Sequence, residues 1–137
     1  MNDVYLPALS TALDGQPRSA VDGIVSGRLG RWFIRNYVEP SPTTKRVPSP
    51  GKIRPDEQID PAILEIFLRS NRHAKDVVRK AAAFDVNRIR YKNPLAPLVR
   101  FSVGTGLDII WKHQSRHLLQ AERVKQSPTF PRQSLAS

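Results

Sequence analysis

Hydrophobic residues recur with helical periodicity most clearly in the last third of the chain. One stripe has intervals of three or four residues and consists of Leu107, Ile110, His113, His117, Ala121 and Val124. Thr105, with Asp108 three residues later, matches a capping box at a helix start. The pattern predicts a helix from about 105 to 125, followed by a flexible tail over 127–137 that contains Pro128 and Pro131.

A second amphipathic pattern begins after Asp60, which is a candidate N-cap, and Pro61, which suits the first helical position. Its apolar residues lie on one broad stripe, formed by Ile63, Leu64, Phe67, Leu68, Ala74, Val77, Val78 and Ala81. We therefore expect a helix over 61–83 with this stripe turned toward the core.

The remaining segments give weaker helical signals. Residues 3–13, which end at Asp14-Gly15, and residues 31–38 predict two short helices. Pro40 to Pro61 holds six of the 12 prolines and predicts an extended crossing loop. Residues 84–97 are interpreted as a connector, because Asn93-Pro94 and Pro97 exclude a long helix. The pattern as a whole predicts an all-α fold in one domain over 1–126.

The composition limits which catalytic and metal-binding groups the chain can contain. The 137 residues include no cysteine, which excludes disulfides, thiolate metal sites and a cysteine nucleophile. Any metal must then be held by the three histidines or by oxygen ligands. No apolar run approaches the length of a membrane span, and no secretory signal is present, so we expect a cytoplasmic protein without a membrane partner.

The charge balance supports an alternative function. With 22 Lys and Arg against 12 Asp and Glu, the formal net charge is +10. Such a chain could bind nucleic acid or another polyanion without being an enzyme, because Lys and Arg neutralise phosphates. The basic residues are scattered along the sequence, however, and match no nucleic-acid-binding motif. A basic surface that serves solubility explains the same charge.

His113 and His117 are the candidate metal ligands. Their i, i+4 spacing places both imidazoles on one face of the expected helix, one turn apart, where they can reach a single ion. Imidazole nitrogen is a preferred ligand of zinc, nickel and similar divalent cations. Because the pair lies on the apolar stripe, we expect both rings to point toward the core. Two buried histidines satisfied by ordinary hydrogen bonds are the alternative.

Three further residues are candidates for the same site. Gln120 follows His117 by three residues, so its amide could orient a ligand imidazole or contact a substrate; it could equally be an exposed polar residue. His73, in the 61–83 helix, and Asp3 are the candidates for a third ligand. His73 is also explained as a residue at the edge of the apolar stripe.

The chain resembles a DinB-like domain. The resemblance covers about residues 3–131 and is carried by Asn93-Pro94-Leu95, by Gly104-x-Gly106-Leu107, and above all by the segment from His113 to Val124. It implies a four-helix bundle with a long crossover loop, often dimeric, and a divalent metal held by three histidines. The two histidines of the family's last helix match His113 and His117. Family members with known activity include thiol-dependent transferases and isomerases.

The chain departs from that family at its start. The family's remaining histidine lies on the second helix, whereas residues 3–13 match only the end of that helix and contain no histidine. We interpret the chain as a fragment or as a shortened relative without the first helix. Loss of a helix exposes apolar stripes, so we expect a homodimer or other self-association, or else poor stability.

The sequence thus favours a divalent-metal-binding helical protein. Its activity is at most that of a metal-dependent, thiol-transferase-like enzyme acting on a small thiol substrate. A catalytically silent bundle remnant with vestigial histidines explains the same residues.

Overall fold

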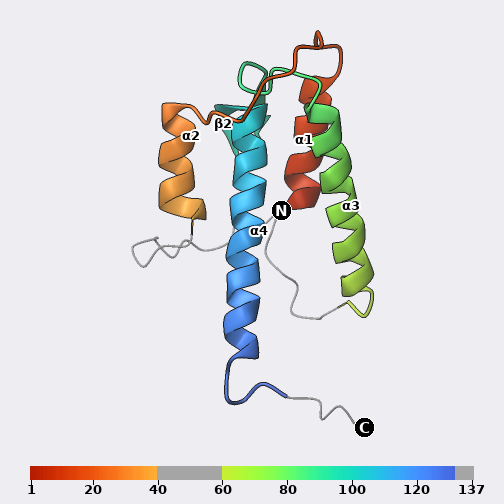
Figure 1. The fold of residues 1–137 in the computed structure, drawn as a ribbon, viewed down its shortest axis with the longest axis vertical. Coiled ribbons are helices and arrows are strands. Elements are labelled where there is room, and N and C mark those ends of the chain that lie inside the picture. Colours follow the sequence, from red (N-terminus) through yellow and green to blue (C-terminus); the bar gives the residue numbers. More distant parts are fainter. Residues whose placement is uncertain (40–59, 132–137) are drawn as a thin grey trace.

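The computed structural model describes residues 1–39 and 60–131 (Figure 1). Their elements are, in chain order, α1 (Asn2–Leu13), α2 (Arg28–Phe33), the π-helical turn η1 (Ile34–Val38), α3 (Ile63–Ala81), β1 (Arg90–Asn93), β2 (Ala96–Ser102) and α4 (Val103–Lys125). Most of the predicted proline-rich loop and the end of the predicted tail lie outside the described residues. The predicted two long helices are present, with slightly different bounds.

The prediction of an all-α, DinB-type four-helix bundle is wrong, because β1 and β2 form a two-stranded antiparallel sheet. Tyr91 and Asn93 are buried whereas Arg90 and Lys92 are exposed, which is the period-two alternation of a strand with one buried face. The Asn93 Oδ1 atom accepts a 2.9 Å hydrogen bond from the Leu95 N–H and shapes the hairpin turn. Asn93-Pro94 therefore starts a turn between strands and does not merely interrupt a helix.

Helix α4 lies at the centre of the fold (Figure 1). Helices α1 and α3 lie on one side of it, α2 lies on the other, and the hairpin packs near its N-terminal end. Lys80, near the end of α3, donates hydrogen bonds to the Ser10 carbonyl oxygen at 3.1 Å and to Asp14 Oδ1 at 2.6 Å. These contacts join the C-terminal ends of α1 and α3, so the two helices run parallel to each other and antiparallel to α4.

Ser102 fixes the start of α4. Its Oγ atom accepts a 3.1 Å hydrogen bond from the Thr105 N–H, which satisfies one of the free donors in the first turn. The helix therefore begins at Val103, two residues before the predicted start. Asp108 does not act as a capping acid; its Oδ2 atom accepts a 3.0 Å hydrogen bond from Ser26 Oγ, which fastens the segment before α2 to α4.

The core occupies only the end of the molecule that contains the hairpin. It is formed by Tyr5, Leu6, Leu9, Leu13, Ile34, Val38, Val77, Ala81, Val86, Tyr91, Phe101, Val103, Leu107, Ile109 and Ile110. Both α3 and α4 continue beyond the start of α1 without such packing (Figure 1). The predicted burial of the whole α3 stripe is wrong for Ile63, Leu64, Phe67 and Leu68 in the first half of the helix, and also for Val78 near its end, all of which are exposed.

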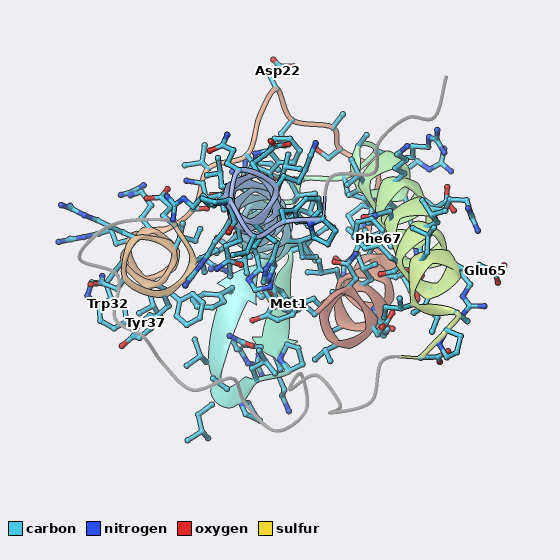
Figure 2. The ribbon with its side chains drawn as sticks, turned by 90° about the horizontal axis from the view of Figure 1, so that it is seen from below. Met1, Asp22, Trp32, Tyr37, Glu65 and Phe67 are labelled. Atoms are coloured by element: carbon cyan, nitrogen blue, oxygen red, sulfur yellow. The ribbon has the colours of Figure 1, made fainter. Side chains whose placement is uncertain are left out.

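Figure 2 shows how the free half of α3 is oriented. Phe67 lies on the side of α3 that is turned toward α4, and Glu65 lies on the opposite side. The stripe thus faces the predicted direction, but α1 is too short to cover it. Within the described ranges, no helix is long and apolar enough to cross a membrane.

Candidate functional site

The histidine pair lies in the middle of α4, just beyond the buried turns of that helix. Residues from Val103 to Leu107 are buried beneath the hairpin and α1, and burial decreases from Trp111 onward. The backbone of α4 continues as a regular helix through this boundary to Lys125. Because His113 and His117 belong to one continuous helix, their relative position is set by helical geometry.

The two imidazoles converge on each other. The Nε2 atoms of His113 and His117 are 2.9 Å apart, and the ring centroids are separated by 4.4 Å at an interplanar angle of 82°. One Nε2 must donate and the other must accept across this contact, so at most one of the two nitrogens carries a hydrogen in the neutral pair. The pair therefore places two ring nitrogens close enough together to contact the same ion.

Gln120 contacts the other nitrogen of His117. The His117 Nδ1 atom lies 2.8 Å from Gln120 Oε1, and an amide oxygen can only accept. The Nδ1 atom of His117 must then carry the hydrogen, which leaves its Nε2 atom with a free lone pair directed at His113. Gln120 is itself exposed, as the alternative expected, and its contact with the ring is the one that the predicted orienting role requires.

The two histidines differ in exposure. His113 is half-buried and His117 is exposed, so the expectation that both rings point into the core is wrong for His117. Its part of α4 extends beyond the packed end of the molecule. Burial is the largest cause that lowers the pKa of His113 to about 4, and His117, the N-terminal ammonium group and Arg116 lower it further. Met1 lies beside α4 (Figure 2). His113 is therefore a neutral imidazole at neutral pH, as metal binding requires.

The candidate third ligands do not join the pair. His73 is exposed on α3, and Asp3 is exposed near the start of α1. Across residues 1–39 and 60–131, no group of three or more His, Cys, Asp or Glu side chains could hold a metal ion. Among the described residues, the site thus consists of two imidazoles and the amide of Gln120.

Gln114 links three helices next to the pair. Its Nε2 atom lies 3.3 Å from Asn2 Oδ1 on α1 and 3.3 Å from Asn71 Oδ1 on α3. On the other side of α4, Lys112 pairs with Glu39 and Arg116 donates a 3.4 Å hydrogen bond to the Tyr37 carbonyl oxygen. These polar contacts hold the turn that carries His113 between α1 and η1. The sequence stripe could not reveal them, since each joins residues far apart in the chain.

A second group of functional interest lies on α2 and η1. Trp32 and Tyr37 are exposed, with ring centroids 5.7 Å apart in an edge-to-face arrangement, and both lie on the outer side of the molecule (Figure 2). Arg28, which lies within roughly 40° of Trp32 around α2, is also exposed, as is Arg35 in η1. The basic residues look scattered along the sequence, and this combination was not predicted from it. Its signal is the i, i+4, i+7 spacing of Arg28, Trp32 and Arg35.

Comparisons with protein-family models, with curated proteins and with solved structures find no match to this chain. The resemblance to DinB-like domains therefore stays a prediction from the residues.

Proposed function

We propose that this chain binds a divalent transition-metal cation, zinc or nickel, through Nε2 of His113 and Nε2 of His117. The single observation that carries the proposal is the 2.9 Å separation of these two atoms. Two imidazole nitrogens bound tetrahedrally to zinc at about 2.0–2.1 Å lie roughly 3.3 Å apart. A cation can therefore replace the shared hydrogen after only a small separation of the rings.

Gln120 supports this role. By accepting the Nδ1 hydrogen of His117, it holds that ring in the tautomer whose Nε2 lone pair is free. His113 must move its hydrogen from Nε2 to Nδ1 when a cation binds. Protonation of His113 competes little at neutral pH, because burial lowers its pKa to about 4.

The same arrangement suits the small-thiol chemistry implied by the DinB-like resemblance. Two imidazoles leave coordination positions for an exogenous ligand, and a bound cation would lower the pKa of a thiol or a water placed there. The chain's own contribution is to orient the rings through Gln120 and to shield one side of His113. If the chain is an enzyme, the activity that we propose is at most that of a metal-dependent, thiol-transferase-like enzyme.

Metal analysis of protein purified without a histidine tag tests the proposal. We expect zinc or nickel to bind to the purified chain and to be lost in the double variant His113→Ala, His117→Ala. His73→Ala is the matched control, because it removes an exposed histidine outside the pair and should leave the metal content unchanged. Equal metal content in the double variant and the original chain would refute metal binding at this pair.

Polyanion binding is the second candidate, and the exposed Trp32 and Tyr37 beside Arg28 and Arg35 favour it. Aromatic faces stack on bases of single-stranded nucleic acid, and arginines neutralise the phosphates between them. Fluorescence anisotropy with a labelled single-stranded oligonucleotide should show affinity that falls steeply with salt. The variant Trp32→Ala should weaken binding, whereas the His113, His117 double variant should not. Absence of binding at low salt would exclude this function.

A further inference from the structure

The histidine pair supplies only half of an ordinary zinc coordination shell. Structural zinc sites in proteins take four ligands in tetrahedral geometry. One chain contributes two convergent Nε2 atoms, and its described residues bring no third histidine or carboxylate to them. The missing ligands must therefore come from outside the described part of this chain.

The helix face that carries the pair remains open beyond it. Ala121 and Val124 lie within roughly 40° of His117 around α4, and both are exposed. Val124 is 58% exposed although it lies on the stripe that continues from the core. Apolar side chains next to an incomplete set of ligands favour a protein surface, more than bulk water, as the neighbour of this face.

We propose that two copies of this chain share one divalent cation, with His113 and His117 of each copy together supplying four imidazole ligands. The proposal rests on the metal binding proposed above, since it uses the same pair. With four imidazoles bound, a tetrahedral cation has no position left for a thiol, so the shared site is structural and stands in place of the thiol chemistry. A two-fold axis through the cation makes the contact self-complementary, because each copy presents the same patch to the other. The second copy then also covers Ala121 and Val124.

The charge of the chain makes this association depend on the cation. Each copy has a formal net charge of +10, so two copies repel each other at low ionic strength. Four imidazole–metal bonds and the burial of Val124 oppose that repulsion. We therefore expect a monomer without metal and a dimer with it.

Zinc titration of the tag-free, metal-free full chain tests the inference. Isothermal titration calorimetry should give one zinc per two chains, and light scattering should show the mass doubling from 15.5 kDa when zinc is added. The double variant His113→Ala, His117→Ala should lose both effects, whereas His73→Ala should keep both. X-ray absorption at the zinc edge should show four nitrogen neighbours.

The outcomes separate this inference from the proposed function. One zinc per chain with an unchanged mass overturns the shared site and leaves metal binding by the pair intact. No binding of zinc, and none of nickel in the same titration, overturns both. A dimer that persists with a chelator and in the double variant overturns the shared site, because its contact would then not involve the cation.

A second pair of variants tests which face of α4 is covered. Val124→Lys places a charge within roughly 20° of His117, whereas Leu119→Lys places one roughly 200° away on the opposite face. The two original side chains are similarly exposed, at 58% and 48%. Val124→Lys should weaken zinc-dependent dimerisation by about tenfold or more, since it loses a buried valine, and Leu119→Lys should leave it unchanged. Equal effects of the two variants would overturn the proposed contact face.

Discussion

The phenol of Tyr5 donates a 3.0 Å hydrogen bond to Oδ1 of Asn93, which lies 88 residues later in the chain. Both side chains are buried, and the same Oδ1 atom accepts from the Leu95 N–H at 2.9 Å. One amide oxygen therefore joins α1 to the hairpin and shapes the hairpin turn.

We expect Asn93→Ala to lower the free energy of unfolding by about 2–6 kcal/mol, because it leaves two donors without their acceptor at roughly 1–3 kcal/mol each. Tyr5→Phe should cost less, since the Leu95 N–H keeps its partner. Urea denaturation followed by circular dichroism measures both changes. Equal losses in the two variants would contradict a shared acceptor.

Gly106 is a position where even a methyl group does not fit. A Cβ atom there would lie 2.6 Å from Leu9 Cδ2 and 2.7 Å from the Tyr91 hydroxyl oxygen. Gly106→Ala should therefore destabilise the protein by about 1–3 kcal/mol, although alanine is the better helix former. Gly27→Ala is the control, because nothing lies within 4 Å of its Cβ position. Thermal unfolding measures both variants. Equal stability of Gly106→Ala and Gly27→Ala would contradict the close packing of Leu9 and Tyr91 against Gly106.

Alkaline pH should lower the free energy of unfolding through the buried tyrosines Tyr5 and Tyr91. Burial raises the pKa of Tyr5 to about 12 and raises the pKa of Tyr91 as well. The unfolded chain releases these protons near pH 10, before the folded protein does. The stabilising contribution is therefore present below about pH 10 and is lost as pH rises through about 12. Denaturation at pH 9 and 11 should show a smaller loss in Tyr91→Phe than in the original chain.

Acidification should destabilise the metal-free protein through His113. Its folded-state pKa of about 4 lies below the ordinary histidine value of 6.5, so the unfolded chain binds the proton first. The free energy of unfolding should then fall as pH decreases from about 6.5 toward about 4. An NMR titration of the imidazole signals of the metal-free chain measures this pKa directly. A midpoint near 6.5 for His113 would contradict its burial.

The sequence predicted the elements whose signals are local. Helices α3 and α4 follow from long periodic stripes, and the convergence of His113 and His117 follows from their i, i+4 spacing. The hairpin was missed because the alternation of Arg90, Tyr91, Lys92 and Asn93 is short, and because Asn93-Pro94 was interpreted only as a helix breaker.

The residues of the apolar stripes on α3 and α4 do not by themselves indicate which part of each stripe is buried. Phe67 and Val77 lie on one apolar stripe, but α1 reaches only the half that holds Val77. Val78 is exposed although it follows Val77 directly, so the burial of each residue depends on the neighbours that the fold places beside it. His117 was expected in the core for the same reason. The links from Gln114 to Asn2 and Asn71 depend equally on tertiary placement.

The outer half of α4 is anchored at one end only. Its turns beyond Arg116, whose guanidinium donates to the Tyr37 carbonyl oxygen, depend on their own backbone hydrogen bonds, so amide exchange should accelerate from Arg116 toward Lys125. His113 and His117 span the last anchored turn, at the boundary where fraying of the free end should stop. A ligand that bridges the two rings would hold that turn closed, and occupancy of the site would then determine how far the rigid part of the helix extends.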